Sequence, residues 1–378
     1  MVPPPSDMVW NTFPRVIPEA RKGAPPLPFH RLLPGYEPTP IVELTDLARE
    51  VGIGRITAKI ETTRLGLPAF KILGASWAIY RELCRRLPGL EERWESLDDL
   101  RQQITPLGEL TFVAATDGNH GRAVAHMARQ LGQRAHILVP AGMAPARIDA
   151  IESEGAAVEV IDGTYDDAIV ASAALMDRSH LVISDTAWDG YQVVPRDVIA
   201  GYSTIFAEAA EQMDDAPTQL FIQMGVGALG TAAILASRPW KAKVVSVEPK
   251  DAACILASIR EKELTEVPGP HRSIMAGLNC GIPSPIAWPL LQTGIDLALA
   301  IPDDAARSAM RMLADAGVVA GETGAAGVAG LMSLATSPNW PEIRKRLKMD
   351  ASSHVLVIIT EGATDPAAWE AITGRRLL

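Results

Sequence analysis

Short runs of β-type residues alternate with helical stretches along most of this chain, and no other feature of the sequence limits the fold as strongly. The expected strands are Arg55–Ile60, Thr111–Ala115, Ala135–Val139, Ala157–Ile161, Leu181–Ser184, Leu220–Met224, Lys243–Val247 and His354–Ile359. Helices are expected from about Leu73, Gly121, Ala144 and Asp166, and over Ile199–Met213 and Ala305–Ala316. Strands that alternate with helices in this way form parallel βαβ units. The sequence therefore predicts the α/β class.

The composition narrows the kind of partner. With 378 residues, of which 48% are hydrophobic, the chain is long enough for about two domains. A formal net charge of −10 opposes the attraction to phosphate backbones on which nucleic-acid binding depends. The apolar runs are much shorter than the ~20 residues of a membrane-spanning helix. We therefore expect a small-molecule partner, no nucleic acid and no membrane span.

The cysteines give no sign of a metal or of an oxidising compartment. Cys84, Cys254 and Cys280 are widely spaced and include no CxxC pair, which argues against a disulfide framework and a structural zinc site. No cluster of histidine, cysteine and aspartate has the spacing of metal ligands. The first residues also lack the charged and apolar regions of a secretory signal. We expect a cytoplasmic protein without a catalytic metal.

Residues 1–38 carry repeated prolines, among them Pro18 and Pro26. Proline disfavours helix and favours an extended chain. This segment is predicted to be an arm that lies on the surface or on a neighbouring subunit.

A glycine-rich loop, Gly225–Gly230, follows the expected strand Leu220–Met224 and opens an alanine-rich helix. Glycines let the backbone approach an anion, and a helix N-terminus supplies unpaired N–H groups, so this GxGxxG pattern predicts a phosphate site. One alternative is a dinucleotide, because Glu248 lies about twenty residues further on, where an acid would bind a ribose. The position in the chain argues against a dinucleotide, because such a glycine pattern usually belongs to the first βα unit and this loop comes late. A glycine turn without a ligand is the other alternative.

A second loop, Thr116–Gly121, follows the expected strand Thr111–Ala115 and contains Asp117, Asn119 and His120. Ligands of α/β sheets bind at the carboxyl ends of the strands, where this loop lies. The same residue types also satisfy local backbone donors in ordinary turns. From the loop alone, both interpretations stay open.

Lys71 lies near the start of the expected helix, among apolar neighbours. Burial and the positive end of a helix both lower the pKa of an amine, which would favour a nucleophilic neutral form. Alternatively, the side chain extends along apolar surface and leaves its ammonium in water, as many lysines do.

Taken together, Lys71, the loop Thr116–Gly121 and the loop Gly225–Gly230 resemble, in order and spacing, the fold-type II pyridoxal-phosphate (PLP) enzymes. Further blocks make the chain similar to the diaminopropionate ammonia-lyases within that class. These blocks are Phe29–Leu44, Gly52–Gly74, Ala115–Gly121, Ser184–Tyr191, Met275–Gly281, Gly321–Gly327 and Ile359–Asp365. The arrangement of Lys71 and the two loops is shared with serine and threonine dehydratases. Asp117 and the block that contains Asp185 are more specific to the diaminopropionate ammonia-lyases.

The resemblance implies two doubly wound α/β domains with PLP in the cleft between them. The small domain is expected as an insertion at 84–199, and residues 1–83 and 200–378 are expected to form the large PLP-binding domain. It also implies a homodimer, in agreement with the predicted arm.

The resemblance assigns the cofactor-binding residues position by position. Lys71 would form the internal aldimine, and Asn119 would hydrogen-bond the phenolic oxygen of the cofactor. Thr360 would face the pyridine nitrogen, and Glu322 would either contact the ring or cap the following helix. The phosphate would be bound by the backbone N–H groups of Gly225, Val226, Gly227, Ala228 and Leu229.

The implied reaction is α,β-elimination of 2,3-diaminopropionate to pyruvate and two molecules of ammonia through an aminoacrylate. Lys71 would remove the Cα proton while PLP takes up the electrons. A β-ammonium leaves only while it is protonated, so nearby carboxylates are needed, and Asp117 and Asp185 are the candidates. Asp117 would also serve as a base on the opposite face for a D-isomer.

Three positions depart from the lyase pattern. Ile60 and Ala363 stand where acids are usual, and Pro68 replaces a polar residue ahead of Lys71. An alternative is therefore a PLP-dependent dehydratase or lyase for another β-substituted amino acid, such as serine, threonine or a hydroxyaspartate. An NAD-dependent oxidoreductase that uses the loop Gly225–Gly230 is a more distant alternative, and a PLP-binding protein without catalysis is another.

Overall fold

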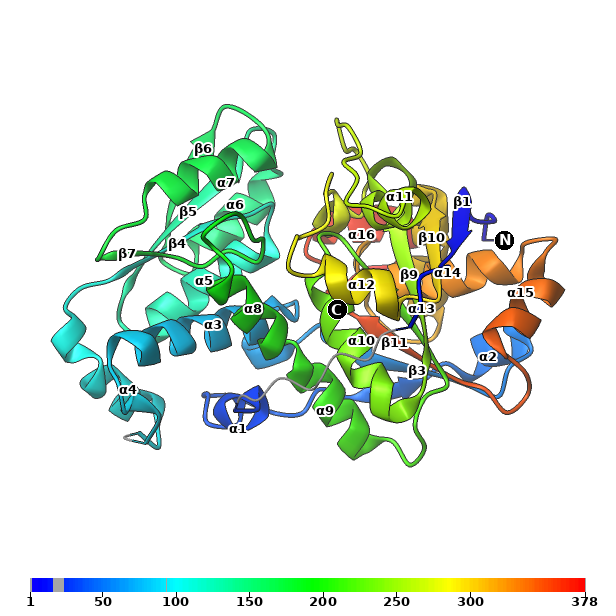
Figure 1. Ribbon diagram of the computed structural model, residues 1–378, viewed down its shortest axis with the longest axis horizontal. Helices are drawn as coiled ribbons and strands as arrows, with labels where there is room; N and C mark the ends of the chain where they lie inside the picture. Colours follow the sequence, from blue (N-terminus) through cyan, green and yellow to red (C-terminus); the bar gives the residue numbers. More distant parts are fainter. Residues whose placement is uncertain (1, 16–23, 93, 378) are drawn as a thin grey trace. The chain divides into compact units, whose positions relative to one another are not determined.

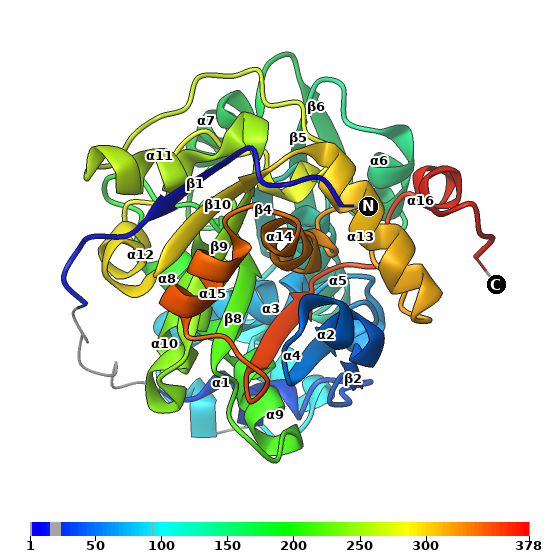
Figure 2. The same ribbon diagram turned by 90° about the vertical axis from the view of Figure 1, so that its right-hand side faces the viewer.

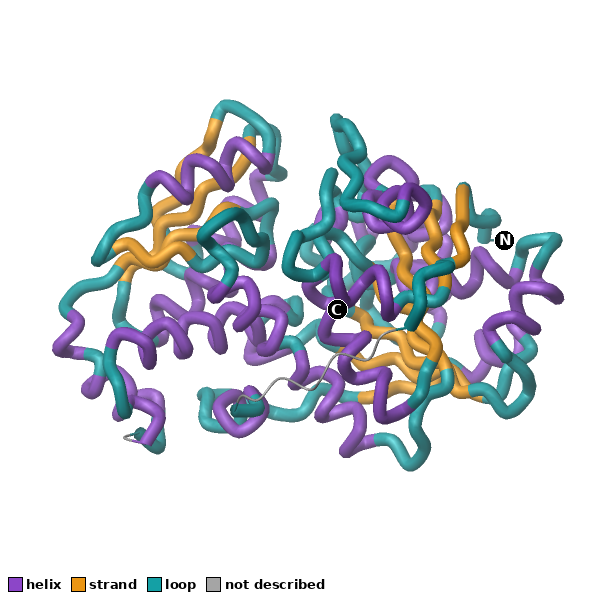
Figure 3. Tube along the Cα trace, in the orientation of Figure 1, coloured by secondary structure: helices purple, strands orange, loops and turns teal. Residues whose placement is uncertain are grey.

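The computed structural model describes residues 2–15, 24–92 and 94–377, which divide into two compact units. The larger unit contains residues 2–15, 38–63 and 205–377 of the described chain, and the smaller unit contains residues 24–37, 64–92 and 94–204. Figure 3 shows that the strands form two sheets, one in each unit. The expected limits of the inserted domain, 84–199, fall within the smaller unit and stay a prediction.

The sheet of the smaller unit has four parallel strands in the order β6-β5-β4-β7. These are β4 (Thr111–Ala115), β5 (Arg134–Pro140), β6 (Ala157–Ile161) and β7 (His180–Val182). Its helices are α1 (Pro26–His30), α3 (Lys71–Arg86), α4 (Leu97–Gln103), α5 (Asn119–Gln130), α6 (Pro145–Glu152), α7 (Tyr165–Ala174) and α8 (Val193–Gly201). Helix α5 packs on β4 and β5, and α3 packs on α5 and α8 (Figure 1).

The sheet of the larger unit has seven strands in the order β1-β10-β9-β8-β11-β3-β2, with antiparallel pairs at both edges. The strands are β1 (Asp7–Trp10), β2 (Ile41–Glu43), β3 (Arg55–Ile60), β8 (Gln219–Gln223), β9 (Lys243–Pro249), β10 (Leu297–Ile301) and β11 (His354–Ile359). The helices are α2 (Thr45–Val51), α10 (Ala228–Trp240), α11 (Cys254–Glu261), α12 (Trp288–Gly294), α13 (Asp303–Asp315), α14 (Ala326–Ala335), α15 (Trp340–Leu347) and α16 (Pro366–Thr373). Helix α14 packs across β8, β9, β10 and β11 and closes the main core of this unit (Figure 2).

The predicted α/β class is confirmed, and four strands, β3, β4, β6 and β11, have the predicted bounds. Strand β10 was not predicted. The helix expected over Ile199–Met213 is two helices, because α8 ends at Gly201 and α9 (Ser203–Gln212) begins after Tyr202. No helix in the described ranges is both long and apolar enough to cross a membrane.

The prediction of a helix-free extended arm is wrong for the described part of residues 1–38. Strand β1 pairs with β10 of the same sheet, and α1 begins at Pro26. Proline is accepted in the first turn of a helix because the N–H groups of that turn have no intrahelical acceptor. The remaining part of the arm, 16–23, which contains Pro18, lies outside the described residues.

Candidate active site

The smaller unit brings Lys71 into contact with Asp185. Lys71 is the first residue of α3, and its Nζ lies 2.6 Å from Oδ2 of Asp185. The Lys71 side chain is 22% exposed and that of Asp185 is 8% exposed. A charge-assisted hydrogen bond of this length, with the amine still partly accessible, combines strong pairing with access for a small molecule.

The sheet topology explains why two acids lie near this lysine. Strands β4 and β7 are parallel neighbours, so their carboxyl ends meet at one edge of the sheet. Asp117 follows the end of β4, and Asp185 follows the end of β7. The carboxyl edge of a parallel sheet is the usual ligand-binding edge of such folds.

The predicted lowering of the pKa of Lys71 is wrong. Burial by itself does lower the pKa of this amine, but the Asp185 carboxylate outweighs burial, and the pKa of Lys71 is raised. The reason lies beyond the local sequence, because the two residues are 114 positions apart. In the protein without a cofactor, Lys71 is therefore an ammonium held by Asp185.

The two aspartates have opposite pKa shifts. Burial raises the pKa of Asp117 to about 6, and the Lys71 ammonium opposes that rise. Burial also acts to raise the pKa of Asp185, but Lys71 dominates there and the pKa of Asp185 is lowered. Asp185 is consequently a permanent carboxylate, whereas Asp117 exchanges a proton close to neutral pH.

Asn119 and His120 lie at the start of α5. His120 is buried, and its Nε2 donates a hydrogen bond to the carbonyl oxygen of Ile183 at 2.7 Å. Burial lowers the pKa of His120, which keeps the imidazole neutral. His120 thus supports the backbone that leads to Asp185.

Tyr202 is a neighbour of Lys71 that sequence reasoning missed. Its ring packs on Phe70 with 4.7 Å between centroids, and it contacts α3 at Gly74, where an added Cβ would come within 2.5 Å of the Tyr202 ring. Burial raises the pKa of the Tyr202 phenol, so it stays protonated beside the Lys71 ammonium. A tyrosine between two helices gives no local sequence signal.

In the larger unit, the loop Gly225–Gly230 connects β8 to the N-terminus of α10, as the sequence predicted. Gly227 has a φ of 98°, which strongly favours glycine, and a Cβ at Gly225 would lie 2.9 Å from Sγ of Cys280. The first N–H groups of a helix have no intrahelical acceptor. This loop therefore has the backbone and the helix dipole that bind a phosphate.

Thr360 follows β11, which is the parallel neighbour of β8, so Thr360 and Gly225 lie at the same edge of the larger sheet. The Thr360 hydroxyl is buried and accepts a hydrogen bond from Nε2 of Gln223 at 2.9 Å. Since Gln223 is the donor, the hydrogen of the hydroxyl is available for an acceptor such as an unprotonated ring nitrogen. Gln223 is a second residue that sequence reasoning missed.

Glu322 is buried in the turn before α14, and Ala325 is the residue at the N-cap of that helix. The role of Glu322, either contact with the ring or capping of the helix, stays a prediction.

Glu248 does not have the environment of a ribose-binding acid. Its carboxylate is buried and accepts hydrogen bonds from the N–H groups of Ile255 at 2.7 Å and Leu256 at 2.8 Å, in the first turn of α11. Burial raises the pKa of Glu248 to about 8. This carboxylate stabilises a helix start, which removes the main support for a dinucleotide.

The predicted residues are thus divided between the units. Lys71, Asp117, Asn119 and Asp185 belong to the smaller unit, and Gly225–Leu229, Glu322 and Thr360 belong to the larger one. An accessible amine, a glycine-rich helix start and a hydroxyl with a free hydrogen are the groups needed for the aldehyde, phosphate and ring nitrogen of PLP. The described residues contain no group of three or more metal-binding side chains.

Comparison with known proteins agrees with this fit. Residues 32–361 match the family model described as pyridoxal-phosphate dependent enzyme. The diaminopropionate ammonia-lyase of Escherichia coli (strain K12) is 38% identical over 351 residues, which cover 89% of this chain and 87% of the relative.

Solved structures give the same result. The holo diaminopropionate ammonia lyase from Escherichia coli superimposes with a TM-score of 0.87 and 32% identity, covering 99% of this chain and 98% of that one. The same enzyme in complex with an aminoacrylate-PLP azomethine reaction intermediate gives a TM-score of 0.83 and 33% identity, covering 97% and 96% of the two chains.

Proposed function

Because this chain belongs to the pyridoxal-phosphate-dependent enzymes and, within them, to the diaminopropionate ammonia-lyase family, we propose that it converts 2,3-diaminopropionate into pyruvate and two molecules of ammonia. The observation that carries this proposal is the ion pair of Lys71 with Asp185, beside the second acid Asp117. An elimination that expels an amine needs a base at Cα and a proton on the leaving nitrogen. These three residues provide both.

Lys71 is the residue that links to the cofactor and then acts as the base at Cα. When bound, pyridoxal phosphate supplies the electron sink for the bond that the base breaks. Because Asp185 stabilises the ammonium form of Lys71, a proton taken up by Nζ is held there. The β-nitrogen leaves as neutral ammonia from its own ammonium form and takes no proton from Nζ.

Asp185 would also bind the β-ammonium of the substrate. A carboxylate whose pKa is lowered stays charged over the whole working range of pH, and an ammonium is its natural partner. Serine and threonine carry a hydroxyl at the same position, which forms no ion pair with this carboxylate. This difference favours a diamino acid over the hydroxy amino acids.

Asp117 would be the second base, on the face of the substrate opposite to Lys71. Its pKa of about 6 makes it a carboxylate at neutral pH that still accepts a proton readily. This role would allow the D-isomer to react.

The remaining predicted residues would bind the cofactor. The N–H groups of Gly225–Leu229 would bind its phosphate, and Asn119 would donate to its phenolic oxygen. Thr360, which is held by Gln223, would donate to the ring nitrogen without protonating it. Glu322 would contact the ring.

The test is the release of 2-oxo acid and ammonia from D- and L-diaminopropionate, serine and threonine by the purified, PLP-loaded protein. We expect pyruvate and ammonia in a ratio of one to two from diaminopropionate. If serine or threonine is turned over faster than both diaminopropionate isomers by orders of magnitude, diaminopropionate is rejected as the substrate. The absence of any 2-oxo acid would reject the elimination itself.

We further propose a cytoplasmic homodimer, with 84–199 as its small inserted domain. The family resemblance supports the dimer. Light scattering coupled to size-exclusion chromatography measures the molar mass of the purified protein directly. A monomeric mass at micromolar concentration would reject the dimer.

A further inference from the structure

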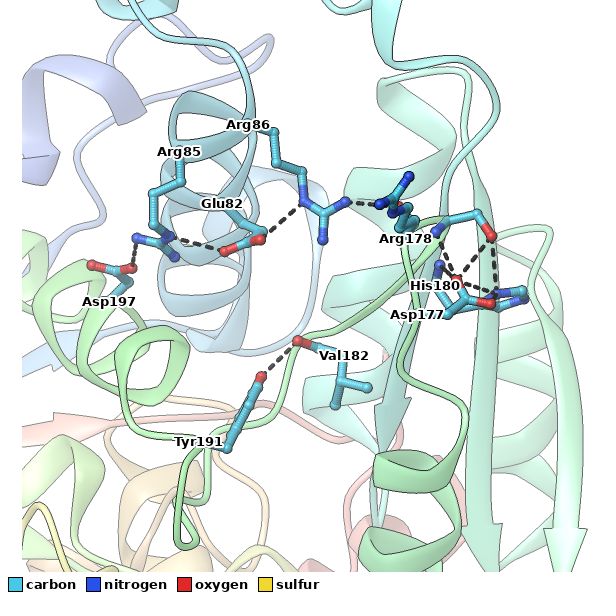
Figure 4. Close-up of polar contacts among 10 residues, drawn as sticks. Glu82, Arg85, Arg86, Asp177, Arg178, His180, Val182, Tyr191 and Asp197 are labelled. Carbon is cyan, nitrogen blue, oxygen red and sulfur yellow. Dashed lines mark hydrogen bonds and ion pairs between the residues drawn. The ribbon is translucent and has the colours of Figure 1, made fainter.

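The backbone that carries Asp185 is held by the phenol of Tyr191. The Tyr191 hydroxyl donates to the carbonyl oxygen of Val182 at 2.6 Å, as Figure 4 shows, and accepts the N–H of Ser184 at 3.1 Å. These two partners flank Ile183, just ahead of Asp185. One side-chain oxygen therefore holds the chain at two points next to the predicted catalytic acid.

The phenol itself is fixed in place. The Tyr191 ring stacks on Trp188, with 4.1 Å between centroids and 13° between planes. The backbones of these two residues exchange hydrogen bonds of 3.2 Å and 3.0 Å, which close the turn between them. Burial raises the pKa of Tyr191, so the hydroxyl keeps the hydrogen that it donates.

The other side of the same segment is held independently. The N–H of Ile183 donates to Val113 of β4 at 2.7 Å, and the Ile183 carbonyl accepts the bond from His120. These bonds extend β7 by one residue. From the loop side, the Tyr191 hydroxyl bonds the backbone of Val182 and Ser184, and the N–H of Thr186 donates to the Ser184 hydroxyl at 3.1 Å.

We propose that Tyr191 is a positioning residue for the elimination, because its hydroxyl keeps the Asp185 carboxylate at the distance from Lys71 that holds a proton on the amine. This inference rests on the proposed function for its kinetic part. Charge interactions in a partly buried site weaken as the distance grows, and a displacement of about 1 Å far from the chemistry is able to cost about 100-fold in rate.

The helix that carries Lys71 is secured separately, so a change at Tyr191 acts on Asp185. The Tyr191 ring lines a cavity of about 300 Å³ together with Glu82, Arg85 and Arg86 from the end of α3. Arg85 pairs with Glu82 at 2.9 Å and with Asp197 of α8 at 2.7 Å (Figure 4). The pair with Asp197 joins α3 to α8 without the phenol.

The test compares Tyr191→Phe with Tyr80→Phe. Tyr191→Phe keeps the ring and its stacking on Trp188 and removes the hydroxyl. Tyr80 is a matched control, since it is a buried tyrosine of α3 whose hydroxyl accepts a hydrogen bond from Trp94 at 3.1 Å. Circular dichroism and resistance of the buried Lys59 to acetylation verify that both variants are folded.

The deciding measurement is the rate of Lys71 acetylation by acetic anhydride at one pH of about 8, followed by mass spectrometry on the full chain without PLP. We expect the rate for Tyr191→Phe to rise about tenfold or more, because a displaced carboxylate stabilises the ammonium less and each unit by which the pKa falls raises the neutral fraction of the amine tenfold. Tyr80→Phe should leave the rate unchanged. An acetylation rate for Tyr191→Phe equal to that of Tyr80→Phe would overturn the proposal, whatever the rate of turnover.

The kinetic measurement uses the PLP-loaded proteins and L-diaminopropionate. We expect kcat of Tyr191→Phe to fall about 10- to 100-fold with a smaller change in KM. A kcat equal to that of Tyr80→Phe would also contradict the proposal. Wild-type protein that releases no pyruvate, combined with faster Lys71 acetylation in Tyr191→Phe, would reject the proposed function and leave the positioning of Asp185 by Tyr191 intact.

Discussion

Two lysines of this protein lie 2.6 Å from a carboxylate, and their surroundings differ completely. Lys59, in the larger unit, is fully buried and donates to Glu208, to the carbonyl oxygen of Thr39 at 2.6 Å and to Gln212 at 2.8 Å. Lys71, in the smaller unit, is 22% exposed and donates a hydrogen bond to Asp185.

The difference separates a structural from a reactive lysine. An ammonium has three hydrogens, and the three acceptors around Lys59 use all of them. Lys71 has one carboxylate partner at this distance, and its side chain is partly exposed. The distance to the nearest carboxylate is therefore a poor guide to function, whereas the number of acceptors and the exposure of the amine are good ones.

The largest expected effect is the loss of activity on Lys71→Ala. Without the amine there is no base at Cα and no covalent link to the cofactor, so pyruvate release should fall by at least about 10⁴-fold. The visible absorption band of lysine-bound PLP should disappear as well. Activity within about tenfold of wild type would remove the distinction between the two lysines.

Lys59→Met should act on stability instead. Removing one partner of a buried ion pair costs about 3–5 kcal/mol in the free energy of unfolding, because the buried Glu208 carboxylate loses the Lys59 ammonium. Urea unfolding measures this loss, and the double variant Lys59→Met/Glu208→Leu is the control that should recover a large part of it. If Lys59→Met is as stable as wild type but inactive when folded, Lys59 is not a structural lysine.

Asp117→Asn tests the second acid beside Lys71. We expect turnover of D-diaminopropionate to fall by about 10²-fold or more while the L-isomer is affected much less, since Lys71 remains as its base. The comparison of kcat/KM for the two isomers measures this. Equal losses for both isomers would make Asp117 a general charge partner rather than a second base.

A smaller effect is expected from pH. The pKa of Asp117 is raised to about 6, so its carboxylate form, the one that accepts a proton, is present above that pH and is lost as the pH falls through it. The value of kcat/KM for the D-isomer should therefore fall about tenfold per pH unit below 6. A D-isomer profile that is flat between pH 5 and pH 7 would argue against this role.

The sequence was sufficient for the fold class and for the cofactor because both depend on local patterns. The bounds of β3, β4, β6 and β11 follow from short apolar runs, and the loops after β4 and β8 follow from their glycines and polar residues. The order of Lys71, Asn119 and the glycine loop identified the cofactor.

The sequence was not sufficient for properties that depend on distant pairs. Lys71 and Asp185 are 114 residues apart, and their contact reverses the pKa shift expected from burial. Lys59 and Glu208 are 149 residues apart, so nothing near Lys59 marks it as structural. Tyr202 and Gln223 were missed for the same reason, because their partners come together only in the folded units.

The most direct test of the difference between the two lysines is reduction of the PLP-loaded protein with borohydride, followed by peptide mapping. The reduced link to the cofactor should be found on the peptide that contains Lys71, and none on the peptide that contains Lys59. A modification at Lys59 or at any other lysine, with Lys71 unmodified, would contradict the assignment of Lys71 as the reactive lysine.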